Sequence, residues 1–228
     1  MIIARFKYYW VRFWMCFAGA SPLGRVATWL ATWFMPPFYN RLYLARLNLR
    51  GYISPRATIY HSDLRLGAHV YIDDRVLIYQ EKDGGAVELG DGVHVNRDTI
   101  IQTGLGGSLT IGANTHIQPR CQFSAYKAPI QIGCCVDIAP NCAFYPYNHG
   151  FAAGRSIREQ PLQTKGGIFV DDEAWLGVNV IVLHGVRIGK GSVIGAGSVV
   201  TQDVPEGAIA FGVPAHVVAM RSHTHEGS

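Results

Sequence analysis

Residues 170–205 read VDDEAW, LGVNVI, VLHGVR, IGKGSV, IGAGSV and VTQDVP, which are six consecutive blocks of six residues. An aliphatic residue opens every block, and a small or branched residue takes the fifth place: Ala174, Val180, Val186, Ser192, Ser198 and Val204. A short fixed period of this kind is typical of a solenoid, here the hexapeptide β-helix, in which each strand pairs with the equivalent strand one turn away. The sequence therefore predicts an all-β solenoid, a parallel β-helix of hexapeptide repeats.

The pattern extends toward the N-terminus as far as Ile53, and three blocks make one triangular turn of 18 residues. Successive turns counted from Leu66 are 23, 22, 21 and 38 residues long, so they exceed 18 residues by 5, 4, 3 and 20. We interpret the short excesses as corner bulges at 81–85, 103–107 and 125–129, which are rich in turn residues. The excess of 20 falls within 145–167, and a long loop on a rigid scaffold is typical of a functional segment.

One outward position of the predicted β-helix carries polar and aromatic residues in every turn. It is the sixth position of the first block, and it is occupied in order by Tyr71, His94, His116, Asp137 and Trp175. Strand stacking would space these residues about 4.8 Å apart in a ladder. We interpret the ladder either as the wall of a groove or as an ordinary solvated face.

Composition favours one domain with a modest appendage, since the 228 residues are 49% hydrophobic and 16% charged. The five cysteines show no metal-binding spacing, and Cys121 and Cys142 occupy the inward fifth position of their blocks. Buried, reduced cysteines indicate a cytoplasmic protein. We expect no metal and no nucleic-acid partner.

Residues 1–50 differ from the rest of the chain. They hold seven Arg or Lys and no acid, and they hold thirteen of the 26 aromatic residues, whereas the remainder has a net charge of about −3. Their uncharged runs are too short to cross a bilayer, which takes roughly 20 apolar residues. We interpret 1–50 as helices that form a peripheral membrane anchor or that cap the end of the β-helix. A cleaved signal peptide is a weaker alternative, because Arg12 splits the apolar region before the Ala18-Gly19-Ala20 stretch.

Four motifs occur in a fixed order along the C-terminal part of the chain: Asn148-His149-Gly150, Trp175-Leu176-Gly177, VIGAGSVVTQDVP at 193–205 and FGVPAHVV at 211–218. With them the chain resembles the left-handed β-helix acyltransferases of the hexapeptide-repeat superfamily, in particular the branch of galactoside, maltose, xenobiotic and polysaccharide O-acetyltransferases. The resemblance covers about 165 residues and excludes residues 1–50. It implies left-handed coiling, which the usual right-handed crossover preference would not predict. We expect a helical segment at 1–50, an acyltransferase domain at 51–210 and a segment that contacts coenzyme A, with a tail, at 211–228.

The resemblance implies a homotrimer whose active sites lie between the β-helices of neighbouring subunits, and it implies acetyl-CoA as co-substrate. Trp175 and Gly177 would border the thioester, and Gly195 and Ala196 would contact pantetheine. Val213 and Pro214 would approach the adenine end. Family members often carry basic residues where Gln202 and His216 stand here, so Arg221 and Lys190 are the expected substitutes for contacts to the coenzyme A phosphates.

Transfer of an acyl group to a hydroxyl needs a base, and a histidine with a reference pKa of about 6.5 suits that role. The resemblance gives the role to His149, on the predicted catalytic loop 145–167, and gives the oxyanion contact to the amide of Val178. Glu159, Asp137 or a main-chain carbonyl would orient the base, while His116 and Asp137 would contact a saccharide acceptor. No acyl-enzyme is required.

Four other functions remain open from the sequence: an amino-sugar N-acetyltransferase, a serine O-acetyltransferase, an acyl-carrier-protein-dependent enzyme and a non-enzymatic scaffold docked on a membrane. A zinc enzyme of the gamma carbonic anhydrase type needs two His residues five positions apart, and neither Phe144 nor Gly154 supplies the second one near His149. We favour O-acetylation of a glycan in the cytoplasm, at the cytoplasmic face of the inner membrane if residues 1–50 bind lipid. The acyl group, acetyl or longer, is left open.

Overall fold

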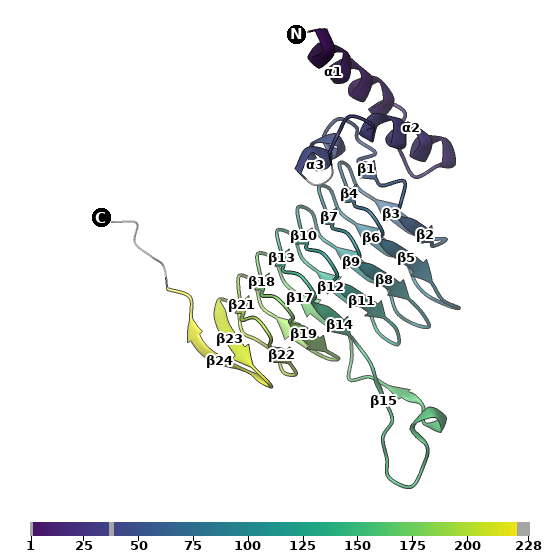
Figure 1. The fold of residues 1–228 in the computed structure, drawn as a ribbon. Coiled ribbons are helices and arrows are strands. Elements are labelled where there is room, and N and C mark those ends of the chain that lie inside the picture. The colour runs from purple at the N-terminus through teal and green to yellow at the C-terminus, as the bar shows by residue number, and fades with distance from the viewer. Residues whose placement is uncertain (1, 37–38, 223–228) are drawn as a thin grey trace.

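The computed structural model describes residues 2–36 and 39–222, so the end of the predicted tail at 211–228 lies outside the described residues. Residues 52–220 wind into a three-sided prism of about seven turns, and each side of the prism is one sheet (Figure 1). Apart from one hairpin at the C-terminal end, the strands of successive turns pair in parallel, and one antiparallel bridge joins Gly84 to Leu105 in the corner bulges. The predicted all-β solenoid is confirmed, and the architecture is consistent with a left-handed β-helix.

Equivalent strands of successive turns make up each sheet. The first sheet contains β1 (Tyr52–Ile53), β4 (Tyr71–Ile72), β7 (His94–Val95), β10 (His116–Ile117), β13 (Asp137–Ile138), β18 (Trp175–Leu176), β21 (Val193–Ile194), β23 (Ala208–Gly212) and β24 (Ala215–Met220). The second sheet contains β2 (Thr58–Tyr60), β5 (Leu77–Gln80), β8 (Ile100–Thr103), β11 (Gln122–Ala125), β14 (Ala143–Tyr145), β19 (Ile181–Leu183) and β22 (Val199–Val200). The third sheet contains β3 (Leu64–Leu66), β6 (Val87–Leu89), β9 (Leu109–Ile111), β12 (Ile130–Ile132), β17 (Ile168–Val170) and β20 (Arg187–Ile188).

The core of the prism is a column of side chains from the repeating inward positions. The first residues of the blocks are buried, as in Leu176, Ile188 and Ile194. The fifth residues are buried as well, and two consecutive ones are Ser192 and Ser198. A small fifth residue leaves room at the corner of a narrow triangle, while the aliphatic first residue fills its centre. The six-residue period therefore decides which side chains leave water.

Corner bulges lie where each turn passes from the second sheet to the third. The predicted bulges at 81–85, 103–107 and 125–129 follow β5, β8 and β11. They stack on one another, since the Gly106 N–H donates to the Asp83 carbonyl at 3.4 Å and the Lys127 N–H donates to the Leu105 carbonyl at 2.9 Å. The long loop leaves the prism at the same corner one turn later, after β14, and projects away from it (Figure 1).

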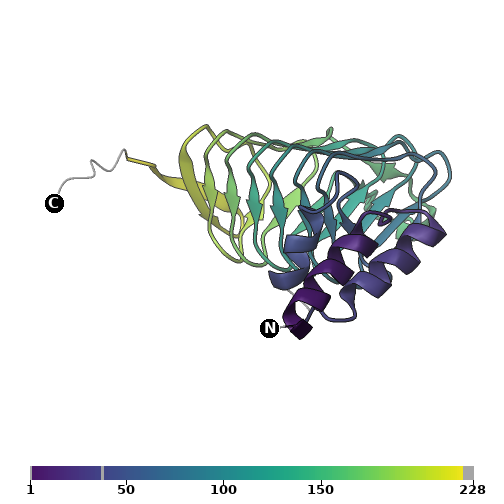
Figure 2. The same cartoon turned by 90° about the horizontal axis from the view of Figure 1, so that it is seen from above.

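Three helices among the described residues cover the N-terminal end of the prism: α1 (Ile2–Met15), α2 (Pro22–Thr32) and α3 (Tyr39–Ala45). Figure 2 shows α1 and α2 lying side by side. Met15 and Leu44 are buried against Tyr52 and Tyr71 of the first two turns. We refer to residues 2–36 and 39–45 as the helical cap, which closes one open end of the solenoid. No helix in the described ranges has the length and apolar character that crossing a bilayer requires.

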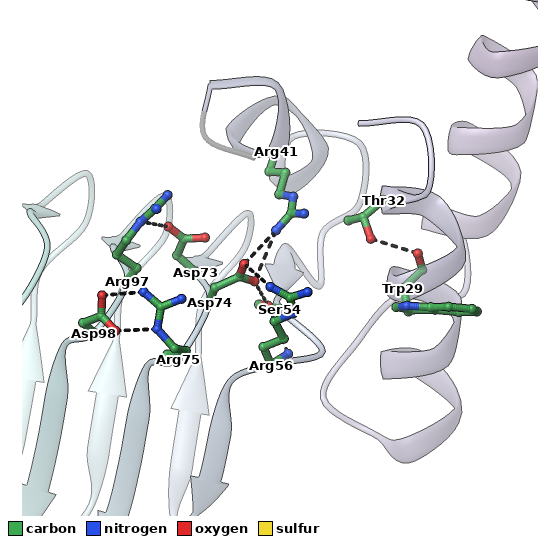
Figure 3. A network of polar contacts seen from close by, with 10 residues as sticks. All are labelled: Trp29, Thr32, Arg41, Ser54, Arg56, Asp73, Asp74, Arg75, Arg97 and Asp98. Atoms are coloured by element: carbon green, nitrogen blue, oxygen red, sulfur yellow. Dashed lines mark hydrogen bonds and ion pairs between the residues drawn. The ribbon is translucent and has the colours of Figure 1, made fainter. Parts of the chain in front are cut away.

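A polar joint connects the cap to the first turns (Figure 3). Arg41 of α3 lies 3.1 Å from an Oδ atom of Asp74, and the Ser54 hydroxyl donates to the same carboxylate. Arg56 approaches this carboxylate at 3.7 Å. From α2, the Arg25 guanidinium donates to the Pro55 carbonyl at 2.7 Å and also to the Ala57 carbonyl. Charge-assisted bonds from two helices therefore fix the orientation of the cap on the prism.

Candidate active site

The projecting loop is held by its own hydrogen bonds. Its strand β15 (Asn148–His149) pairs antiparallel with β16 (Leu162–Gln163), so His149 lies opposite Leu162. At the base of the loop the Thr164 hydroxyl donates to the Pro146 carbonyl at 2.6 Å. Farther out, the Gln160 side chain accepts from the Ala152 N–H at 2.8 Å and donates to the Ala152 carbonyl at 3.0 Å. The loop is therefore an ordered arm that holds His149 at a fixed place outside the prism.

His149 is exposed and borders a hollow of about 390 Å³ at the base of the arm. The hollow is lined by Tyr145, Tyr147, Asn148, His149, Leu183 and His184. His184 comes from the next turn of the prism, and its Nδ1 accepts from the Lys165 N–H at 3.1 Å. Burial lowers the pKa of His184, and the charge of Lys165 lowers it further. The neutral His184 ring therefore presents an Nε2–H donor beside His149.

Glu159 lies apart from the imidazole that it was expected to orient. It ends a short 3-10 helix, η1 (Ile157–Glu159), in the outer part of the arm, and its side chain is exposed. Within the described residues its carboxylate makes no hydrogen bond or ion pair with His149. Within one chain, the side chains that line the hollow together with His149, including His184, are the groups placed to interact with its imidazole.

The predicted outward ladder is confirmed on the first sheet. Tyr71 pairs with His94, His94 with His116, His116 with Asp137, and Asp137 with Trp175. Its N-terminal end is covered, because Tyr71 is 1% exposed beneath the cap, whereas Trp175 is 53% exposed. Over five turns the ladder thus changes from side chains buried under the cap to side chains exposed to solvent.

Two histidines of the ladder form a stack that Asp137 extends. The rings of His94 and His116 lie 4.4 Å apart and nearly parallel, and His116 Nδ1 lies 3.4 Å from Asp137 Oδ1. Burial lowers the pKa of His94 to about 4, with further contributions from His116 and Arg46. Asp137 therefore contacts His116, and in one chain it lies on the ladder away from the arm.

The two histidines line a groove of about 580 Å³ on this side of the prism. The groove is lined by Leu42, Tyr71, Asp73, His94, Asn96, Arg97, His116, Gln118, Pro119 and Pro140. Its amides, imidazoles and guanidinium offer hydrogen-bond donors and acceptors beside apolar surface, which is the composition of a site for a polar organic ligand. His116 was expected here from the sequence, whereas Asn96 and Gln118 were not, although each follows the ladder position of its turn by two residues.

The segment from Trp175 to Val178 turns the corner between the first and second sheets. A Cβ atom on Gly177 would lie 2.7 Å from the Ala196 nitrogen, so glycine is required by the close approach of the next turn. The Val178 carbonyl accepts from the Gly197 N–H at 2.7 Å. Among the described residues the Val178 N–H donates to no other group, so it is free to bind an anionic oxygen.

Gly195 and Ala196 occupy the equivalent corner one turn later, and Ala196 is exposed. A Cβ atom on Gly195 would lie 2.7 Å from Cβ of Phe211, so the glycine lets β23 cross this corner. The turn between β23 and β24 contains Val213, which is 72% exposed, and a cis bond to Pro214. Four of the residues expected to bind coenzyme A thus lie along one edge of the first sheet.

Arg221 lies at the other edge of that sheet. Its guanidinium donates to the Gly191 carbonyl at 2.6 Å, at the corner between the third and first sheets. Lys190 lies at the same corner, with its ammonium 3.4 Å from Glu173. The expected substitutes for the phosphate contacts are therefore separated within one chain from Val213 and Pro214.

The predicted catalytic groups do not meet within one chain. His149 is attached where the second sheet passes to the third, whereas Val178 lies where the first sheet passes to the second. One side of the prism, a block of six residues or roughly 20 Å at about 3.3 Å per residue, separates these two corners.

Among the described residues no group of three or more His, Cys, Asp or Glu side chains could hold a metal ion.

Comparisons with known proteins agree with this architecture. A model of the bacterial transferase hexapeptide (six repeats) matches residues 167–202. Galactoside O-acetyltransferase of Lactococcus lactis subsp. lactis (strain IL1403) is 42% identical over 88 residues, which cover 39% of this chain and 42% of that protein. An N-acetyltransferase of 2,3,4,5-tetrahydropyridine-2,6-dicarboxylate from Staphylococcus aureus (strain JH9) is 42% identical over 59 residues, 26% of this chain and 25% of that protein. The chain spans less than half the length of these curated relatives.

Solved structures show the same fold. A mutant of AntD, an N-acyltransferase from Bacillus cereus, in complex with dTDP-4-amino-4,6-dideoxyglucose and coenzyme A has a TM-score of 0.55 at 20% identity, covering 75% of this chain and 80% of AntD. The polySia specific acetyltransferase NeuO has a TM-score of 0.52 at 20% identity, covering 77% of this chain and 86% of NeuO. At this identity the likeness shows the fold alone.

The matched hexapeptide repeats, the prism and the curated relatives together support the resemblance to the hexapeptide-repeat acyltransferase superfamily that the motifs indicate. Its galactoside branch is represented by the Lactococcus lactis relative.

Proposed function

We propose that this protein is an acetyl-CoA-dependent O-acetyltransferase that acetylates a hydroxyl of a saccharide. The separation of His149 from Val178 by one side of the prism carries the proposal, because it calls for a site shared between copies. A homotrimer would bring the arm of one protomer to the first sheet of its neighbour. The galactoside O-acetyltransferase match and the saccharide ligand in the AntD complex support a sugar as acceptor.

In the proposed reaction His149 removes the proton from the acceptor hydroxyl as the oxygen attacks the thioester carbonyl. The Val178 N–H of the facing protomer donates to the carbonyl oxygen as it becomes negative. His149 then returns its proton to the departing thiolate of coenzyme A, so the ring ends neutral and the acetyl group ends as an ester. Asp137 of the facing protomer or a carbonyl oxygen orients His149 in this proposal, because Glu159 of the same arm lies apart from the ring. The Nε2–H of His184 is placed to donate to a sugar oxygen in the hollow.

Acetyl-CoA would lie along the edge formed by Trp175, Gly177, Gly195 and Ala196, with Val213 and Pro214 toward the adenine. The two glycines let the neighbouring turn pack closely at this edge, and in this proposal the thin pantetheine chain lies along the backbone there. Arg221 and Lys190 would contact phosphates only across a seam, since they lie at the other edge of the sheet. The saccharide would occupy the groove that contains His116, with Asp137 at its open end.

The proposed setting is cytoplasmic. Residues 1–50 would contact the inner membrane peripherally from its cytoplasmic face, which would bring the cleft close to lipid-linked saccharides.

Transfer to an amino group is the second candidate. The Staphylococcus aureus relative and AntD are both N-acyl transferases by name, and the former shares 42% identity over 59 residues. An unprotonated amine is a stronger nucleophile than a hydroxyl, so it depends less on a base. An acceptor panel with matched hydroxyl and amino sugars separates the two reactions.

The test combines two variants that each remove one half of the shared site. His149→Ala removes the base and should lower kcat by about 10² to 10⁴. Ala196→Trp fills the exposed edge where pantetheine would lie and should abolish acetyl-CoA turnover. Turnover is followed by release of free thiol and by product mass.

Co-refolding equal amounts of the two variants tests the shared site directly. Random assortment into trimers leaves about a quarter of the seams with both native halves, so activity should recover to about that fraction. Mixed preparations without recovery would contradict a shared site. Full turnover by His149→Ala with a hydroxyl acceptor would exclude His149 as the base.

A further inference from the structure

The outer face of α2 carries its large apolar side chains. The residues that α2 buries are small: Gly24, Ala27, Thr28 and Ala31. The opposite stripe consists of large residues that are each more than half exposed: Leu23, Val26, Trp29 and Trp33. A helix that only closed the end of a prism in water would show the reverse arrangement. This helix therefore presents to its surroundings the surface that a soluble helix would bury.

α1 and the turn that follows it carry a second exposed stripe. Phe6, Tyr9, Phe13 and Phe17 follow helical spacing and are all more than half exposed. The opposite side of α1 is used for packing, because Val11 and Met15 are buried against the cap core. The helix is thus apolar on two faces: one is buried in the cap core, and the other stays more than half exposed.

The two stripes belong to one surface. Trp10 of α1 donates from Nε1 to the Leu30 carbonyl of α2 at 2.8 Å. The Phe34 ring, which follows α2, lies 6.1 Å from the Phe6 ring and 6.0 Å from the Trp10 ring. We refer to the two exposed stripes together as the aromatic surface, which consists of Phe6, Tyr9, Phe13, Phe17, Leu23, Val26, Trp29 and Trp33.

The charged side chains that the helical cap itself carries are all positive, and Asp74 of the prism, which lines a hollow with Trp29 and Trp33, is paired with Arg41. Arg5 and Lys7 are exposed on α1, as is Arg12, and helical spacing places these cations on the two flanks of its aromatic stripe. Residues 1–50 contain no Asp or Glu to neutralise them. Apolar side chains bordered by cations match the boundary between acyl chains and anionic head groups.

We propose that the aromatic surface docks onto a bilayer that contains anionic phospholipid, with α1 and α2 lying in the plane of the interface. Fourteen residues of helix extend about 21 Å, which is shorter than the roughly 30 Å hydrocarbon core. Tyrosine and tryptophan favour this interfacial depth because their rings are apolar at one end and polar at the other. The inference deepens the membrane setting of the proposed function by naming the surface and the lipid class, and it rests on that setting.

The polar joint gives the docking a structural consequence (Figure 3). Trp29 lies on α2 beside the joint, where Arg41 and Ser54 bind Asp74. Because these bonds fix the cap on the prism, a cap held at the lipid surface also holds the prism in one orientation. The reactive arm is then kept at a defined position relative to the membrane.

Flotation of the full-length protein with vesicles tests the docking. Wild type should bind vesicles of phosphatidylcholine with added phosphatidylglycerol, and should bind pure phosphatidylcholine at least tenfold more weakly. The variant Phe13→Ser/Trp29→Ser/Trp33→Ser should lose binding tenfold or more. The matched control is Val217→Ser/Val218→Ser/Met220→Ser, which removes three exposed apolar side chains from β24 at the other end of the prism and should bind as wild type.

Two further measurements, of turnover and of oligomeric state, distinguish a loss of membrane docking from a loss of catalysis or of assembly. Acetylation of a water-soluble saccharide by the aromatic-surface variant should equal that of wild type, so loss of flotation with retained turnover supports docking alone. Equal flotation of wild type and variant would overturn the proposal. So would a change of oligomeric state in the variant without vesicle binding by wild type, because a second copy would then cover the surface.

Discussion

The prism and the helical cap use large apolar residues in opposite ways. In the prism, Phe123 and Phe144 stack in the core with their rings 4.6 Å apart and are fully buried. In α2 of the cap, small residues such as Ala31 are buried, while Trp33, which directly follows this helix, is 62% exposed. The prism is thus stabilised by its buried rings, whereas the outer face of the cap leaves its large apolar side chains in contact with solvent.

The largest effect that the comparison predicts is the loss of a core ring. Phe144→Ala should lower the free energy of unfolding by about 3 to 5 kcal/mol, because it removes a buried ring and leaves a cavity beside Phe123. Trp33→Ala should change it by no more than about 0.5 kcal/mol. Chemical denaturation of both variants measures the difference, and similar losses would contradict the contrast between the two regions.

A substitution on the buried face of α2 should have an intermediate effect. Ala31 is fully buried, so Ala31→Leu adds three carbon atoms where α2 meets its neighbours and should cost about 1 to 3 kcal/mol. Val26→Leu enlarges a residue on the exposed face of the same helix and serves as the matched control. Thermal unfolding should separate the two variants. If both were tolerated equally, the small residues of α2 would not be required by packing.

The smallest effect is expected at the boundary between the two regions, where His94 lies on the ladder beneath the cap. Burial lowers its pKa from 6.5 to about 4, so the folded protein resists a proton that the unfolded chain accepts. The unfolded state therefore binds more protons between about pH 6.5 and pH 4, and stability is lost as the pH falls through that window.

His94→Gln should remove part of this acid sensitivity. Because the ring stays partly in contact with solvent, we expect a difference of about 1 kcal/mol between wild type and variant when the loss from pH 7 to about pH 5 is compared. Urea denaturation at both pH values measures it. An identical pH dependence of the two proteins would show that His94 contributes nothing to it.

The sequence predicted the parts of the fold that follow the six-residue period. The ladder from Tyr71 to Trp175 and the corner of the long loop could be located because each turn repeats the same three sides. The cap has no such period, so its dual character as a packed end and an exposed aromatic surface became visible only from burial.

The candidate site was predicted less completely, for a related reason. His184 neighbours His149 because a loop of more than one block folds back onto the prism, and no local pattern encodes that return. Glu159 and Arg221 are close in sequence to predicted site residues but are turned away from them by the arm and by β24. Their positions depend on tertiary structure and not on spacing.

The constant rise of the solenoid makes the prism a spacer of defined length. Five strand-to-strand steps separate Tyr52, which packs under the cap, from Trp175, which begins the proposed thioester edge. At about 4.8 Å per step the two lie roughly 24 Å apart. Gain or loss of one whole turn in a related chain would shift the reaction centre by a single step without altering its chemistry, so turn number alone could adapt such a protein to glycans of different reach.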